Sequence, residues 1–127
     1  MRALRNKKMI LTVCLSPCID VTVELDALEV GKTNIAKRKR IRAGGKALNV
    51  ALDVARLGED VITTGFMYET GKELFFRLLE ENGVKHNFVL NEGRIRENYK
   101  FIDHKSMLTE VNDVGEAVPE SAREVLV

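Results

Sequence analysis

The order of apolar segments constrains the fold of this chain more than any other feature of its sequence. Residues 9–15 form a nearly continuous apolar run, the pattern of a strand buried on both faces of a parallel sheet. Residues 47–57 then carry apolar side chains at helical spacing, and a second apolar run follows at residues 61–66. An amphipathic segment before Asn82 and a strand near residues 86–90 continue the alternation. This order indicates an α/β fold in which right-handed crossovers connect parallel strands.

Local signals place the ends of the two helices. Gly58 suits the left-handed position just past the end of the first helix, and Asn82–Gly83 ends the second. Thr70 and Glu73 have the Thr-x-x-Glu spacing of a capping box, which predicts that Thr70 caps the second helix. Pro119 marks a third, short helix start, and we expect the chain to stop inside that element, as a fragment of a larger protein would.

A second group of segments does not fit the parallel sheet. Residues 19–25 alternate between apolar and polar side chains, as a half-exposed strand does. Residues 33–42 resemble a returning strand, and the basic stretch at residues 37–40 predicts a solvated strand rather than a nucleic-acid surface. The sequence therefore predicts a small separate sheet, a flap or lid, to which residues 95–111 could add.

Length, charge and cysteine spacing limit the classes of function. At 127 residues the chain is one domain or less, and its net charge of +1 at pH 7 argues against a nucleic-acid or membrane partner. No apolar run approaches the roughly 20 residues that cross a bilayer, and we interpret the basic residues 1–8 as a short leader of a cytoplasmic protein. Cys14 and Cys18 lack the spacing of a redox or zinc pair, so both are expected to be ordinary small residues.

Familiar catalytic and nucleotide-binding motifs fail on spacing. Residues 30–33 end like a P-loop, but the first glycine that a P-loop requires would fall on Asp26. The chain has no Gly-x-Gly-x-x-Gly and no Gly-x-Ser-x-Gly, so neither a dinucleotide fold nor a serine-hydrolase elbow is supported. His86 and His104 are isolated, without the paired spacing of metal ligands, and we expect no metal site in the chain.

A candidate binding site lies at the start of the first helix. Gly44 and Gly45 close a loop directly before the helix, where unpaired backbone N–H groups attract anions and the missing Cβ lets a ligand come close. Lys46 adds a positive charge, and Asn49 lies one helical turn further on. These residues predict a cradle for a phosphorylated or polyhydroxylated small molecule. The alternative is a plain glycine turn that leads into a helix.

Five collinear stretches resemble the PfkB (ribokinase-like) sugar kinases, and within them the branch of 1-phosphofructokinases and tagatose-6-phosphate kinases. They are residues 13–20 (first strand and Asn-Pro-Ala-x-Asp turn), 31–34 (lid turn), 43–58 (first family signature), 93–100 (Thr-Arg-x-Asn-x-Lys strand) and 109–112 (its Thr-Glu-Ile-Asn continuation). Two positions depart from the pattern, since Ser16 replaces the usual Asn and Ile95 the usual Thr. The resemblance covers about residues 9–118.

The resemblance implies a ribokinase-like fold, a three-layer Rossmann-type parallel sheet with a small β lid. Residues 1–127 would be the N-terminal part of one such kinase domain, with lid strands at about 19–42 and 94–111. In the complete family enzyme, ATP and Mg²⁺ are the cofactors, and an aspartate in a Gly-Ala-Gly-Asp loop is the base. The chain contains no such loop, so we assign no catalytic residue and expect the C-terminal nucleotide-binding half to be absent.

The resemblance also implies contacts to the acceptor sugar. Asp20 would accept hydrogen bonds from sugar hydroxyls, and Arg96 would bind the phosphate already on the substrate. Gly44, Gly45 and Asn49 would line the sugar pocket with backbone N–H and amide groups. The structural alternatives are that Asp20 merely caps a turn and that Arg96 sits on an exposed strand face.

The function implied is a sugar-phosphate kinase that transfers the γ-phosphoryl group of ATP to a phosphosugar hydroxyl, with fructose 1-phosphate as the favoured acceptor. Lys46 points to the phosphosugar branch, and Lys32 would reach a phosphate from the lid, across the interface of a homodimer formed through the lid strands. The isolated chain is expected to be inactive. Two alternatives are a non-catalytic sugar-phosphate-binding module and a fragment that dimerises through its lid.

Overall fold

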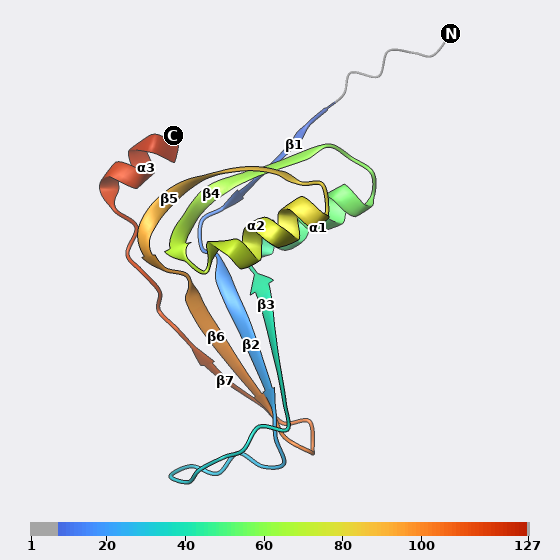
Figure 1. Cartoon of the computed structure of the whole chain (residues 1–127), viewed down its shortest axis with the longest axis vertical. Helices are drawn as coiled ribbons and strands as arrows, with labels where there is room; N and C mark the ends of the chain where they lie inside the picture. The colour runs from blue at the N-terminus through green and yellow to red at the C-terminus, as the bar shows by residue number, and fades with distance from the viewer. Residues whose placement is uncertain (1–7, 127) are drawn as a thin grey trace.

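The chain folds into two sheets that meet end to end (Figure 1). The computed structural model describes residues 8–126, so the predicted basic leader lies outside the described residues except for Lys8. One sheet has three strands in the order β1-β4-β5 and the other has four in the order β3-β2-β6-β7. No helix among residues 8–126 is long and apolar enough to cross a membrane.

The three-stranded sheet is parallel throughout and carries the helices. Its strands are β1 (Ile10–Cys14), β4 (Val61–Thr70) and β5 (Lys85–Arg94), and its helices are α1 (Lys46–Arg56) and α2 (Lys72–Glu81). Helix α1 leads from the lid into β4, α2 connects β4 to β5, and both β1–β4 and β4–β5 pair in parallel. This arrangement confirms the α/β fold that the alternation of segments predicts.

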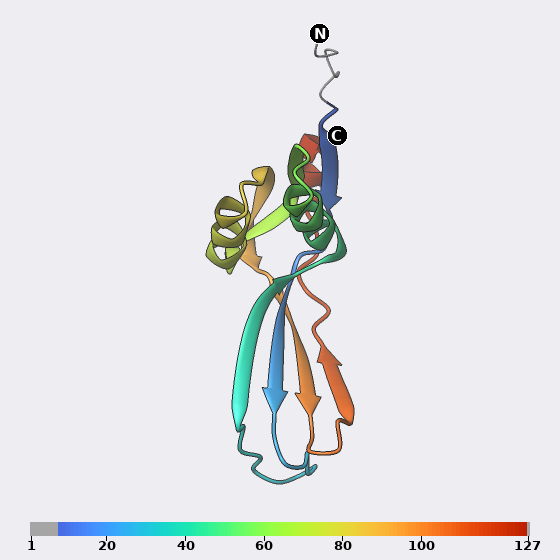
Figure 2. The same ribbon diagram turned by 90° about the vertical axis from the view of Figure 1, so that its right-hand side faces the viewer.

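The four-stranded sheet forms the lid, which extends away from the helices (Figure 2). Its strands are β2 (Cys18–Glu24), β3 (Arg38–Gly44), β6 (Arg96–Ile102) and β7 (Leu108–Asn112). Strand β2 pairs in parallel with β6 and antiparallel with β3, and β7 pairs antiparallel with β6. The returning strand β3 begins later than the sequence predicts, because residues 25–37 form a loop. A third helix, α3 (Glu120–Leu126), contacts β5.

The core lies between the three-stranded sheet and the apolar faces of α1 and α2. Leu48 and Ala51 of α1 and Phe75 and Leu79 of α2 are 1% exposed or less, and Met67 of β4 meets them in the same cluster. Burial of one such large side chain contributes roughly 1.5–3 kcal/mol to folding. The i, i+3, i+4 spacing of these residues is the reason that the segments form helices against the sheet.

Two local predictions are wrong. Strand β1 is not buried on both faces: Leu11 is 58% and Val13 43% exposed, because α1 covers only the face that carries Thr12 and Cys14. Thr70 does not cap α2. It ends β4, where its backbone oxygen accepts a hydrogen bond from the Ile95 backbone N–H at 3.1 Å, and Gly71 is the N-cap in a left-handed conformation without a side-chain cap.

Truncating Leu79 to alanine tests the assignment of the core. The fully buried side chain leaves a cavity, and Leu79→Ala is expected to lower the free energy of unfolding by about 2–5 kcal/mol in urea titration. Leu57→Ala is the matched control, since Leu57 is 81% exposed and its loss is expected to stay within about 0.5 kcal/mol. Equal effects of the two substitutions would contradict this core.

Candidate functional site

A hollow of about 630 Å³ lies where the carboxyl end of β1, the start of α1 and the lid strands β2 and β6 meet. Its walls combine apolar and polar residues from all four elements. The lining residues are Val13, Cys14, Leu15, Ser16, Cys18, Asp20, Gly45, Lys46, Ala47, Asn49, Arg96 and Lys100. The carboxyl end of a parallel strand next to a helix N-terminus is the usual place for a ligand in α/β proteins.

The hollow brings together five of the seven residues that the sequence singles out for substrate binding. They are Asp20 on β2, Gly45 before α1, Lys46 and Asn49 on α1, and Arg96 on β6. These residues come from segments up to 76 positions apart (20 to 96) and face one cavity. Their role as substrate contacts stays a prediction.

Gly44 does not line the hollow, but it lies against two residues that do, Asp20 and Cys18. A Cβ at Gly44 would lie 2.5 Å from Oδ2 of Asp20 and 3.1 Å from Sγ of Cys18. Because carbon and oxygen do not approach so closely, any side chain at position 44 would displace the Asp20 carboxylate. The next residue, Gly45, has φ of 127°, a conformation that residues with a Cβ rarely adopt.

The amino end of α1 presents free hydrogen-bond donors to the hollow. Gly45 is the N-cap and offers no side-chain acceptor, so the first N–H groups of the helix lack a capping partner. The first helical bond runs from the Asn49 N–H to the Gly45 oxygen at 3.0 Å. No acidic residue lies in the first turn, and the exposed Lys46 begins the helix, so the local potential is positive.

Arg96 brings an unsatisfied donor to the same hollow. Its Nε is buried and has no hydrogen-bond partner within residues 8–126. A buried N–H without an acceptor is costly, and an anion in the hollow would satisfy it. The stem of the side chain packs on Gly115, where a Cβ would lie 3.2 Å from Cβ and from Cδ of Arg96. Oδ1 of Asp113 accepts a hydrogen bond from the Gly115 N–H at 3.2 Å and holds that turn.

Sequence reasoning missed two neighbours of Arg96 on β6. Lys100 lines the hollow, and the buried Oδ1 of Asn98 has no partner within the described residues. Asn98 is the register partner of Asp20 in the parallel β2–β6 pair. Their spacing in the sequence could have identified them, because residues two apart on a strand share a face. Arg96, Asn98 and Lys100 therefore form one row.

The two cysteines are walls of the hollow. Cys14 and Cys18 are free and buried, and burial is the main cause that raises the pKa of each thiol. The Asp20 carboxylate raises the pKa of Cys18 further. Both thiols are therefore neutral at neutral pH and are poor nucleophiles. This fits the expectation that they are ordinary small residues.

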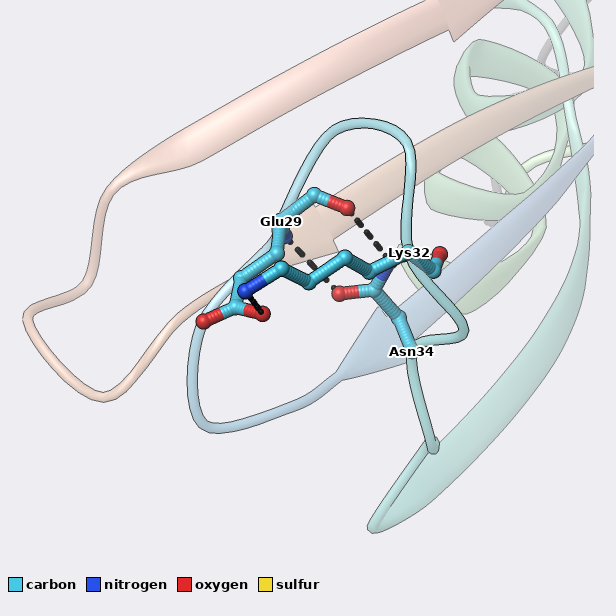
Figure 3. A network of polar contacts seen from close by, with 3 residues as sticks. All are labelled: Glu29, Lys32 and Asn34. Carbon is cyan, nitrogen blue, oxygen red and sulfur yellow. Dashed lines mark hydrogen bonds and ion pairs between the residues drawn. The ribbon is translucent and has the colours of Figure 1, made fainter.

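Lys32 lies in the loop after β2, at the end of the lid remote from α1 (Figure 1), and does not line the hollow of its own chain. Figure 3 shows how this loop is braced: the Asn34 side chain accepts from the Glu29 N–H at 2.8 Å and donates to the Glu29 oxygen at 2.9 Å. Nζ of Lys32 pairs with the Glu29 carboxylate at 3.2 Å.

The histidines do not form a metal site within the described chain. His86 stacks on Phe76, with ring centroids 4.7 Å apart, and Nδ1 of His104 lies 2.5 Å from the Asp26 backbone oxygen. No group of three or more His, Cys, Asp or Glu residues among residues 8–126 could hold a metal ion.

Known proteins resemble the chain over most of its length. It is 32% identical over 114 residues to a 1-phosphofructokinase of Vibrio cholerae, a match that covers 90% of this chain and 36% of the relative. It is 31% identical over 108 residues to the 1-phosphofructokinase of Escherichia coli K12, with 85% and 35% covered. The chain therefore spans about a third of the length of these curated relatives.

Solved structures share the fold. A Thermotoga maritima protein described as a possible 1-phosphofructokinase superposes with a TM-score of 0.78 at 28% identity, covering 94% of this chain and 39% of that one. Phosphofructokinase-2 of Escherichia coli, in complex with substrates and products, gives 0.83 at 21% identity over the same shares. The model of the pfkB family carbohydrate kinases matches residues 11–124. With nearly every residue inside that match, the chain belongs to the pfkB family of carbohydrate kinases.

Proposed function

We propose that this chain provides the acceptor-sugar side of a kinase that transfers the γ-phosphoryl group of ATP to a hydroxyl of a phosphosugar. One observation carries the proposal: Arg96, whose buried Nε has no hydrogen-bond partner within residues 8–126, lines the same hollow as Asp20 and the uncapped start of α1. The hollow thus offers a hydroxyl acceptor next to several donors for a phosphate, which is the polarity of a phosphosugar.

Each residue has a role set by its chemistry. Both oxygens of the Asp20 carboxylate accept hydrogen bonds from sugar hydroxyls, and the Asn49 amide offers a donor and an acceptor. Arg96 binds the phosphate through its guanidinium fork, while Lys46 and the α1 N–H groups add positive potential. Fructose 1-phosphate is the favoured acceptor, because both curated relatives described above are named 1-phosphofructokinase.

We assign no residue of this chain to the binding of ATP, the phosphoryl donor. The sequence has no Gly-Ala-Gly-Asp loop, and residues 8–126 offer no cluster for a metal ion. In this proposal ATP and Mg²⁺ belong to the complete kinase, where Mg²⁺ would neutralise charge on the phosphates. This chain contributes the positioning of the acceptor. A cytoplasmic location belongs to the same proposal.

A second candidate function is dimerisation through the lid. Register places Val21, Ile41, Tyr99 and Val111 on one face of the lid sheet, opposite the face that carries Asp20. Ile41 is 52% and Val111 57% exposed, whereas Val21 is buried, so this face is open along its two outer strands in the single chain. Phosphofructokinase-2 of Escherichia coli has a tetrameric form, which supports self-association in the family. In such a homodimer the loop with Lys32 would approach the partner subunit.

Substituting Arg96 tests the acceptor site directly. Arg96→Gln is expected to weaken fructose 1-phosphate binding roughly 10- to 150-fold by isothermal titration calorimetry, because a hydrogen bond to a charged group contributes about 1.5–3 kcal/mol. Arg94→Gln is the matched control, since Arg94 is exposed and does not line the hollow. Unchanged affinity in Arg96→Gln would remove Arg96 from the site.

The isolated 127-residue chain is expected to be inactive. With ATP, Mg²⁺ and fructose 1-phosphate, ADP release from the purified chain should stay at the rate of a blank without protein. Acceptor binding measured on the same sample separates an incomplete active site from an unfolded chain. Specific activity that grows in proportion to the amount of chain would refute the proposed division of roles.

Self-association is tested on the exposed lid face. The wild-type chain is expected to sediment as a dimer in analytical ultracentrifugation, and Ile41→Glu as a monomer, because a buried carboxylate would lack a partner. Leu57→Glu, at an even more exposed position outside the lid, should sediment like the wild type. Loss of the dimer in Leu57→Glu but not in Ile41→Glu would place the interface elsewhere.

A further inference from the structure

A second hollow, of about 480 Å³, lies between β3 and the helices α1 and α2. It is separate from the acceptor hollow except for one residue, because Asn49 lines both. Its charged walls are Arg42 of β3, Arg56 of α1 and Arg77 of α2. The function proposed above uses none of these three arginines.

The arginines give this hollow a positive potential. Arg42 and Arg77 form no ion pair or side-chain hydrogen bond within residues 8–126, and both side chains are exposed. Arg56 pairs with Asp53 at 3.3 Å on the solvent side, where such a pair contributes little. Glu81 is the acidic member of the lining. Three guanidinium groups therefore face one carboxylate, which favours an anionic ligand.

The floor of the hollow is apolar. Leu52 is buried, Leu74 and Leu78 are half-buried, and all three line the cavity beneath the arginines. A fully hydrated ion such as inorganic phosphate would leave this floor in contact with water. A ligand with an apolar body would cover it and gain about 25 cal/mol for each Å² removed from water.

We propose that this hollow binds a small organic anion, with a phosphate, sulfonate or carboxylate head at Arg42 and Arg77 and an apolar body over Leu52, Leu74 and Leu78. A small molecule fits better than an acidic segment of a protein, since β3, α1 and α2 enclose the cavity on three sides and its volume falls within the roughly 300–1,000 Å³ of small-molecule pockets. The proposal stands independently of the kinase assignment.

The probe for this site is 1-naphthyl phosphate, and its binding to the 127-residue chain is measured by isothermal titration calorimetry. We expect affinity at least about tenfold above that of inorganic phosphate, which lacks the apolar body, and above that of 1-naphthol, which lacks the charge. Equal affinity for 1-naphthyl phosphate and either comparison compound would overturn the proposal, because one of the two walls would then contribute nothing.

Variants locate the bound probe. The double substitution Arg42→Gln with Arg77→Gln is expected to weaken 1-naphthyl phosphate binding at least about tenfold, while Lys85→Gln, exposed on β5 and outside the hollow, leaves it unchanged. Circular dichroism of each variant reports whether the fold is retained. Arg96→Gln weakens phosphate binding in the acceptor hollow only, so the probe binding that the double substitution removes should persist in this variant.

Two results would contradict the assignment. Loss of probe binding in Arg96→Gln, with retention in the double variant, would place the anion in the acceptor hollow. Binding of a glutamate-rich amphipathic peptide to the wild-type chain, without binding of 1-naphthyl phosphate, would identify an acidic protein segment as the occupant.

Discussion

The close approach of the backbone at Gly44 to the Asp20 side chain is the contact on which the rest of the site depends. A Cβ at position 44 would lie 2.5 Å from Oδ2 of Asp20, so a side chain there would push the carboxylate out of its present position. At this point the lid sheet ends and α1 begins, since Gly45 turns the chain with φ of 127°. The two adjacent glycines therefore have different roles: Gly44 leaves room for the Asp20 carboxylate, and Gly45 turns the chain into α1.

The hollow gains its chemistry from the junction of the two sheets. The lid sheet supplies Asp20 and Arg96 on the neighbouring strands β2 and β6, and the start of α1 adds Lys46 and the first N–H groups of the helix. The junction leaves Nε of Arg96 and Oδ1 of Asn98 buried and without partners within the described residues. Natural proteins rarely keep such groups unless a ligand, ion or water completes them, so these two atoms favour a ligand in the hollow.

Much of the architecture could be predicted because it rests on periodicity. The stripe of Leu48, Ala51 and Leu52 specifies α1, and the Gly44–Gly45 pair fixes where it starts. The exposure of Leu11 could not be predicted, since a continuous apolar run does not say which faces of an edge strand are covered.

The predicted cap of α2 failed because β4 is longer than the sequence indicates. A capping box at Thr70 requires β4 to end earlier than it does, and the backbone bond between Thr70 and Ile95 keeps the residue in the strand. For the site, family motifs pointed to Asp20 and Arg96. The motif of residues 93–100 also contains Asn98 and Lys100, but only the strand register shows that Asn98 lies beside Asp20 and Lys100 beside Thr22.

The central claim is most directly tested by following the Arg96 Nε–Hε resonance of the ¹⁵N-labelled chain during titration with fructose 1-phosphate. We predict a saturable shift of this resonance, with the Arg94 resonance unchanged; saturation elsewhere in the spectrum while Arg96 stays in place would contradict the account.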